Sequence, residues 1–117
     1  MAEVRKYRPL VYIVSRYAGD VEENLEKTQA FCRFALEQGQ IPLSGTLAFS
    51  SLMDDDNPEE RSLALFMDIV LMGKCDEVWV LVTNKGFSDG MTTEILRAKK
   101  RRQKIRFFNS KFEEVEQ

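Results

Sequence analysis

The chain has 117 residues, of which 44% are hydrophobic and 31% charged, and this predicts a single globular domain over residues 1–117 with one hydrophobic core. Its 17 basic and 19 acidic side chains leave a net charge of −2, which argues against a nucleic-acid partner because binding to phosphates needs a basic surplus. The sequence contains no histidine, so imidazole-based catalytic triads and histidine-ligated metal sites are excluded. We expect no metal and no cofactor.

The apolar segments of the sequence are short. Basic residues precede an apolar run at 10–14, but this run is shorter than a signal peptide requires. The longest apolar stretch, 63–72, is interrupted by Asp68 and cannot cross a bilayer. Cys32 and Cys75 lie in apolar helical context and are predicted to be reduced core thiols. We therefore expect a soluble, cytoplasmic protein with no membrane partner.

The first third of the chain predicts a strand, a helix and a second strand. Residues 9–15 form a run of mainly β-branched and aromatic residues, which is typical of a buried strand. Asp20, with Glu23 three positions later, forms a capping box that begins a helix ending at Gly39. The proline in the short strand at 41–43 indicates an edge position in the sheet.

The middle of the chain is predicted to be a loop followed by a helix. Residues 44–56 have no periodicity, and a long irregular loop in a small domain is more often functional than idle. The three adjacent acids at 54–56 cannot all face one metal ion from an extended loop, so solubility is the expected explanation. Asn57 as cap and Pro58 at the first position then begin a helix that runs to about Lys74.

The last third adds a strand, a helix and a strand. Residues 76–83 are apolar on both sides, which predicts a central strand. Ser88 begins a helix that ends near Arg102, and a further strand covers 105–108. The polar residues 109–117 are expected to form a frayed tail or a short helix.

Strands that alternate with helices predict right-handed crossovers and an α/β fold. We expect an open, doubly wound parallel sheet of four to five strands in a three-layer α/β/α sandwich, flavodoxin-like or Rossmann-like, with a core over about 9–108. Ligands of such sheets bind at the carboxyl ends of the strands. The loops that follow these strand ends are 15–20, 44–56 and 83–90, and we expect the ligand site there.

Asp68 interrupts an otherwise apolar helix, and two interpretations of it are open. The carboxylate either lies in solvent or faces a polar cleft or a subunit interface, because an unpaired buried charge is costly. The helix around it is apolar on nearly every side, so one side is expected to pack on the sheet and the other to meet another chain. We therefore expect a homo-oligomer, which a monomeric mass at micromolar concentration would contradict.

Two further segments carry candidate binding residues. The segment from Ser88 through Gly90 to Glu94 offers a cap hydroxyl and free amides at a helix start, which suits a phosphate or carboxylate, although ordinary capping with a surface acid explains it as well. In the loop 15–20, Arg16 could pair with a phosphate and Tyr17 could stack on a base. Neither a GxGxxG fingerprint nor a Walker A loop is present.

The run 97–106 contains seven basic residues. These side chains are expected to be solvated and to complement the dipole at a helix C-terminus. A nucleic-acid patch is the alternative, which would make the protein a nucleic-acid accessory factor, but aromatic residues are absent from the run before Phe107.

In the order of these features the chain resembles the nucleoside 2-deoxyribosyltransferase family and its relatives that hydrolyse deoxynucleoside 5′-monophosphates. The resemblance covers about 10–108 and is strongest for a small branch found in bacteria and phages. Its marks are a strand tyrosine followed by a Ser/Arg/Gly loop, an acid in the middle helix, the strand sequence CDEVWVLV and a Ser-x-Gly-x-x-x-Glu helix start: Tyr12, 15–19, Asp68, 75–82 and 88–94.

The resemblance implies a role for each matching residue. Glu94 would be the nucleophile that attacks C1′ of a deoxyribosyl group, as in a retaining glycosidase. Asp68 would guide protons to the leaving base, and Tyr12 would position the nucleophile. Ser88 and Gly90 match the part of the family that holds a 5′-phosphate. Further candidate substrate-binding residues come from the loops 15–20 and 44–56: Ser15, Arg16, Tyr17, Gly19 and Phe49.

The resemblance therefore implies the activity of an N-glycosidase or deoxyribosyltransferase that acts on a small-molecule nucleoside or nucleotide. The alternative is a non-catalytic protein of the same fold that senses or sequesters a nucleotide. In that case Glu94 would accept hydrogen bonds from ribose hydroxyls.

Overall fold

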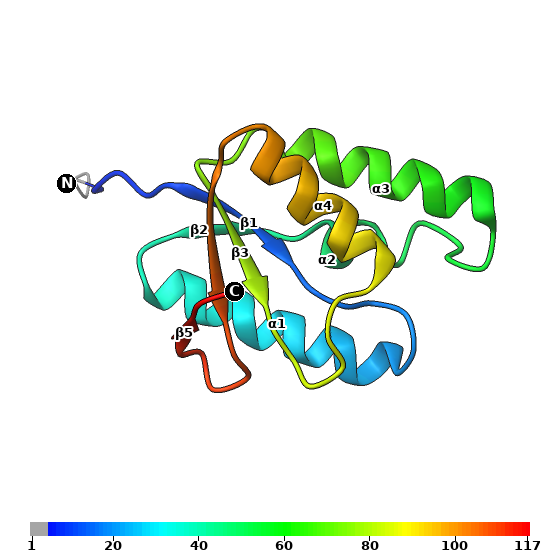
Figure 1. Ribbon diagram of the computed structural model, residues 1–117, viewed down its shortest axis with the longest axis horizontal. Helices are drawn as coiled ribbons and strands as arrows, with labels where there is room; N and C mark the ends of the chain where they lie inside the picture. The colour runs from blue at the N-terminus through cyan, green and yellow to red at the C-terminus, as the bar shows by residue number, and fades with distance from the viewer. Residues whose placement is uncertain (1–4) are drawn as a thin grey trace.

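The computed structural model describes residues 5–117, so the first four residues of the predicted domain lie outside the described part. Five strands form one sheet with helices on both sides (Figure 1). In chain order the elements are β1 (Leu10–Val14), α1 (Val21–Glu37), β2 (Ile41–Leu43), α2 (Gly45–Phe49), α3 (Pro58–Met72), β3 (Glu77–Leu81), α4 (Asp89–Lys100), β4 (Lys104–Phe108) and β5 (Glu114–Val115).

The strand order is β2-β1-β3-β4-β5, and the first four strands run parallel. The predicted edge position of β2 and central position of β3 are therefore confirmed. The chain goes from β1 to β2 on one side and then returns to place β3 on the other side of β1. The strand order thus reverses between β1 and β3, and their carboxyl ends are where a ligand is expected.

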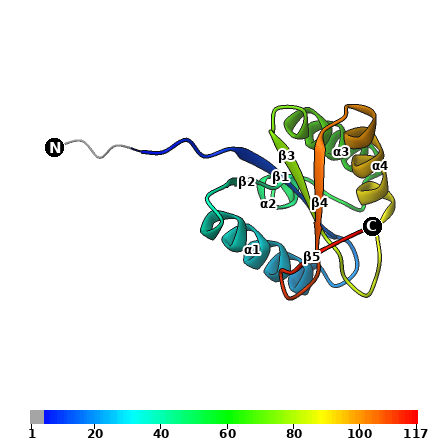
Figure 2. The same ribbon diagram turned by 60° about the vertical axis from the view of Figure 1, so that its left-hand side comes forward.

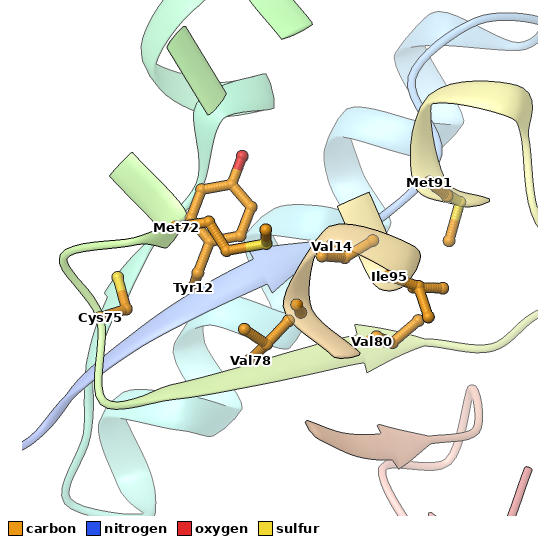
Figure 3. Close-up of a cluster of buried hydrophobic side chains, with 9 residues drawn as sticks. Tyr12, Val14, Met72, Cys75, Val78, Val80, Met91 and Ile95 are labelled. Carbon is orange, nitrogen blue, oxygen red and sulfur yellow. The ribbon is translucent and has the colours of Figure 1, made fainter. Parts of the chain in front are cut away.

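The helices form the outer layers of a three-layer sandwich, as predicted (Figure 2). One sheet face packs on α1, mainly through an aromatic cluster of Phe31, Trp79 and Phe108. The other face packs on α3 and α4, and Figure 3 shows this second cluster. Its members come from β1, β3, α3 and α4 and from the turn after α3: Tyr12, Val14, Met72, Cys75, Val78, Val80, Met91, Ile95 and Ala98.

The predicted helix starts are confirmed at their caps. The Asp20 side chain accepts from the Glu23 amide at 3.1 Å, and Asn57 accepts from the amides of Glu59 and Glu60. Ser88 accepts from the Met91 amide at the start of α4. These side-chain acceptors satisfy amides that a helix start leaves without a partner.

Two expectations were wrong. The segment 44–56 is not loop throughout, because Ser44 accepts from the Leu47 amide at 3.1 Å and caps the short helix α2, which is too short to show periodicity. The last residues are neither frayed nor helical. Asn109 accepts from the amides of Lys111 and Glu113 and turns the chain back, so that β5 pairs antiparallel with β4.

The cysteines, the basic end of α4 and the apolar segments can also be compared with the predictions. Both cysteines are free thiols, with Cys75 buried and Cys32 half-buried. In the last turn of α4 the basic side chains Arg97, Lys99 and Lys100 stand where they complement the helix dipole. Within residues 5–117, none of the helices combines the length and the apolar character needed to cross a membrane.

Candidate active site

A cavity of about 510 Å³ lies beyond the carboxyl ends of β1 and β3, at the reversal of strand order. All three loops selected from the sequence contribute to it, together with α2, α3 and α4. Its lining consists of Ser15, Tyr17, Ala18, Gly45, Thr46, Phe49, Ser50, Met53, Asp55, Arg61, Ala64, Leu65, Asp68, Ser88, Asp89, Gly90, Met91, Thr93 and Glu94.

Glu94 contributes a buried carboxyl group to this cavity. It lies on the face of α4 that turns towards the sheet, next to the core residues Met91 and Ile95, and only 7% of it is exposed. Burial raises the pKa of Glu94 from 4.5 to about 8, and the charge of Asp68 adds to this rise. A hydrogen bond from Tyr12 acts in the opposite direction. A titratable group so strongly shifted in a cavity is a candidate for catalysis.

Asp68 lines the same cavity from α3, so the structure selects the polar-cleft interpretation over the solvated one. Burial raises its pKa from 3.8 to about 7, while a hydrogen bond from Tyr12 lowers it. Its Oδ1 atom is buried and has no hydrogen-bond partner among residues 5–117. Two carboxyl groups from different helices thus share one cavity, and each raises the cost of ionising the other.

Tyr12 lies beneath the two carboxyl groups. It is fully buried on β1, and Figure 3 shows its ring standing off the strand with the hydroxyl at the far end. Burial raises the pKa of Tyr12 far above its usual value, and the charges of Glu94 and Asp68 raise it further. The hydroxyl therefore stays protonated, and its single O–H can donate to one of the two carboxylates at a time.

Gly45 allows these groups to approach one another. A Cβ atom built on Gly45 would lie 2.5 Å from Cγ of Asp68 and 2.7 Å from the Tyr12 hydroxyl, both well inside van der Waals contact. Only a residue without a side chain leaves room for the carboxyl group and the hydroxyl at this point. Gly45 follows directly on the α2 cap Ser44, so the short helix brings its backbone against the site.

The start of α4 forms another part of the wall. Ser88, Asp89 and Gly90 line the cavity, and the space where Gly90 would carry a Cβ atom is open. The first backbone amides of the helix and its positive dipole end therefore border the cavity. This is the position predicted for an anionic group.

The β1–α1 loop is only partly in the site. Ser15 and Tyr17 line the cavity, with the Ser15 hydroxyl 2.7 Å from the hydroxyl of Thr28. Arg16 and Gly19 are outside the lining. The guanidinium of Arg16 instead donates to the carbonyls of Lys85 and Gly86 and ties this loop to the β3–α4 loop. Arg16 thus has a structural role in joining two loops, and a contact of Arg16 or Gly19 with the substrate stays a prediction.

Phe49 lies in the cavity wall as predicted, but several of its neighbours were missed. Arg61 lies seven positions before Asp68, a spacing that puts both on one helix face, and this signal could have found it. Gly45 carried no signal except its place after a strand. Within residues 5–117, no group of three or more histidine, cysteine, aspartate or glutamate side chains is placed to hold a metal ion.

Comparison with known proteins places the chain in a family. Residues 9–108 match the model of the family described as Domain of unknown function (DUF7768). The chain belongs to the DUF7768 family. A search of curated proteins found no match to this DUF7768 sequence.

Two solved structures have a fold similar to that of this DUF7768 chain. A 2-deoxyribosyltransferase from Bacillus psychrosaccharolyticus superposes with a TM-score of 0.70 at 14% identity, over 92% of this chain and 77% of that chain. A 2-desoxiribosyltransferase from Leishmania mexicana gives a TM-score of 0.64 at 13% identity, over 86% and 64% of the two chains, so this chain spans less than two thirds of its length. At these identities the resemblance is one of fold, and at that level the family resemblance predicted from the motifs is confirmed.

Proposed function

We propose that this protein cleaves the N-glycosidic bond of a deoxynucleoside or deoxynucleotide, as an N-glycosidase or a deoxyribosyltransferase. The observation that carries the proposal is that Glu94 and Asp68, from two helices far apart in the sequence, line one cavity, and that both interact with the buried hydroxyl of Tyr12 on β1. The fold, shared with two 2-deoxyribosyltransferases, supports the same reaction class. Carboxyl groups and a hydroxyl suffice for this chemistry, so the absence of histidine is no obstacle.

In the proposed reaction Glu94 is the nucleophile and Asp68 the acid. An oxygen of the ionised Glu94 attacks C1′ of the sugar, so that a C–O bond forms while the C–N bond breaks and its electron pair leaves with the base. Asp68 gives its proton to a ring nitrogen of the base, which departs neutral. Water or a second base, deprotonated by Asp68, then displaces Glu94 from C1′ and restores both groups.

Tyr12 is proposed to position the nucleophile. Its hydroxyl interacts with Glu94 and Asp68 and is held below them by the surrounding core. A fixed donor beneath Glu94 restricts the rotation of the carboxylate and keeps one oxygen directed at the substrate. The start of α4, with Ser88 and Gly90, is proposed to bind the sugar hydroxyl or a 5′-phosphate through backbone amides.

The test is a panel of deoxynucleosides and their 5′-monophosphates incubated with purified protein. We expect release of the free base from at least one member of the panel, and exchange of bases when a second base is added if the protein is a transferase. Chromatography of the products measures both reactions. Release that continues at the same rate in a Glu94→Ala variant would contradict the assigned roles.

The pH dependence of this activity is expected to be bell-shaped. With the pKa of Asp68 near 7 and that of Glu94 near 8, the pair carries a single proton between these values, mainly on Glu94. The reactive form is the minor tautomer of this state, in which Asp68 holds the proton and Glu94 is ionised, and its amount follows the same pH dependence. At lower pH both groups are protonated and Glu94 has no free charge for attack; at higher pH both are ionised and no acid remains for the leaving base. The expected maximum of kcat therefore lies between about pH 7 and 8, and a kcat that stays flat from about pH 6 to 9 would contradict it.

Non-catalytic nucleotide binding is the second candidate function. The observation that favours it is the pKa of Glu94 near 8, because at neutral pH the protonated group is a hydrogen-bonding partner rather than a nucleophile. Tight binding of an intact nucleotide, with no turnover over hours, would select this function over cleavage.

The homo-oligomer remains a prediction for this protein. Leu63, Phe66 and Val70 recur on one side of α3 and are 49%, 63% and 43% exposed. This side faces away from the strip of α3 that lines the cavity, which supports the expectation that a second chain covers it.

A further inference from the structure

The part of the cavity furthest from Glu94 along α3 carries an unused positive charge. Arg61 is the only cation in the cavity lining, and in residues 5–117 its guanidinium forms neither a hydrogen bond nor an ion pair. By contrast, the guanidinium of Arg101 donates to the carbonyl of Ile69. Arg61 is an exposed residue of the cavity wall, and a guanidinium there without a protein partner is available to a ligand.

The turn before α3 contributes a carboxylate, that of Asp55, to the cavity that Arg61 lines. Asp55 also lines the cavity, and the neighbouring Asp54 amide donates to Oε1 of Glu60 at 3.3 Å, which holds this turn against the first turn of α3. Asp55 and Arg61 therefore border the same end of the cavity, yet no ion pair joins them. A ligand edge that offers both an acceptor and a donor fits between them.

The strip of α3 between Arg61 and Asp68 fits a flat aromatic ring. Ala64 and Leu65 line the cavity on this strip, and Phe49 and Met53 line it from α2 and the turn after it. Seven residues of helix span about 10 Å, so Arg61 and Asp68 stand at opposite ends of an apolar slot. A base that leaves the sugar at the Asp68 end would present its far edge to Arg61 and Asp55.

We propose that Arg61 and Asp55 read this far edge and select oxo bases over amino bases. The inference rests on the proposed function and names its substrate class. Hypoxanthine and uracil present a carbonyl oxygen next to a ring N–H, so the oxygen accepts from Arg61 while the N–H donates to Asp55. Adenine and cytosine present an amino donor in place of the oxygen, and this donor would face the guanidinium.

The charges of the cavity disfavour a phosphate at Arg61. Four carboxyl groups line the cavity against this single guanidinium: Asp55, Asp68, Asp89 and Glu94. Asp55 lies at the same end as Arg61 and would repel a dianion. A neutral base edge has no such penalty, which favours base reading over phosphate binding here.

The experiment compares ligands that differ in this one group. Dissociation constants of deoxyinosine and deoxyadenosine, and of deoxyuridine and deoxycytidine, are measured by calorimetry in a Glu94→Gln background so that chemistry does not interfere. We expect the oxo member of each pair to bind roughly tenfold to a hundredfold tighter. Arg61→Gln should remove most of this preference, because an amide offers a donor and an acceptor alike. Arg97→Gln, which removes the same charge from an exposed position of α4 outside the cavity, should leave the preference intact.

Each other outcome overturns the inference in a recognisable way. Equal binding within both pairs, or a preference that persists in Arg61→Gln, excludes base reading by this residue. An equal loss for all four ligands gives Arg61 a general role only. If the 5′-monophosphates of the four nucleosides, measured in parallel, lose affinity and the nucleosides do not, Arg61 is a phosphate ligand. If no nucleoside binds at all, the proposed function itself fails and the inference with it.

Discussion

A Glu94→Gln variant is expected to lose roughly a thousandfold or more in kcat while it still binds substrate. The amide keeps the shape and the hydrogen-bonding capacity of the buried side chain, but it cannot form the bond to C1′. Rates of base release and dissociation constants, measured on the same preparations, separate the two effects. Glu26→Gln makes the same chemical change at an exposed position of α1 and should leave both quantities unchanged.

The same variant should be more stable than the wild type at alkaline pH. Because the folded-state pKa of Glu94 is raised from 4.5 to about 8, the folded protein holds this proton more tightly than the unfolded chain. Its contribution to stability is complete below about pH 4.5 and is lost as the pH rises through about 8. The advantage of Glu94→Gln in free energy of unfolding should therefore grow by roughly 5 kcal/mol from acid to alkaline pH, as followed by denaturant unfolding.

An advantage of Glu94→Gln that is the same at acid and alkaline pH would show that Glu94 is not held in a protonated, desolvated state. A rate that falls together with a loss of folded protein would show instead that Glu94 acts through the fold. The unfolding free energies measured at different pH values therefore decide whether the lower kcat of Glu94→Gln comes from the loss of the nucleophile or from a loss of folded protein.

Gly45→Ala is expected to reduce kcat about a hundredfold with only a modest loss of stability. The added methyl group would overlap the Asp68 carboxyl group and the Tyr12 hydroxyl, and the short Asp68 side chain is the one that can rotate away. Asp68 would then move towards solvent and its pKa would fall towards its ordinary value. Besides the lower rate, the acid side of the pH profile, which follows Asp68, should therefore shift to lower pH.

The control for Gly45→Ala is Gly73→Ala at the end of α3. There a Cβ atom would lie 2.8 Å from Nη1 of Arg101, the end of a long side chain that can move aside. Thermal unfolding should change by a similar small amount in both variants, while base release should fall only in Gly45→Ala. An unshifted pH profile in Gly45→Ala would contradict the positioning role, whatever the change in rate.

Most of the fold could be predicted from the sequence because its signals are local. Caps such as Asp20, Asn57 and Ser88 mark the helix starts, and the strand at Glu77–Leu81 is apolar on both faces. The elements that escaped prediction are short. The helix α2 covers five residues and the strand β5 two, so neither shows a period, and both depend on tertiary contacts for their stability.

The site was predictable only where a motif marked it. Glu94 and Asp68 could be named from the sequence, but nothing in the helix around Asp68 decided between solvent and cavity, because its neighbours are apolar on every side. The hydrogen bonds of Arg16 could not be predicted from its place after the strand, because the backbone carbonyls that accept them come from a loop about 70 positions away. Gly45 becomes informative only when Tyr12 and Asp68 are seen on either side of it.

Glu94 is proposed to form a covalent bond to the sugar, and rapid quenching followed by mass spectrometry detects that bond. The protein is mixed with a deoxynucleoside that it cleaves, quenched in acid within one turnover and digested. We expect a peptide containing Glu94 that has gained one deoxyribosyl group, and the same peptide without this group in Glu94→Gln. Release of base without any such adduct, or an adduct on Asp68 instead, would contradict the account.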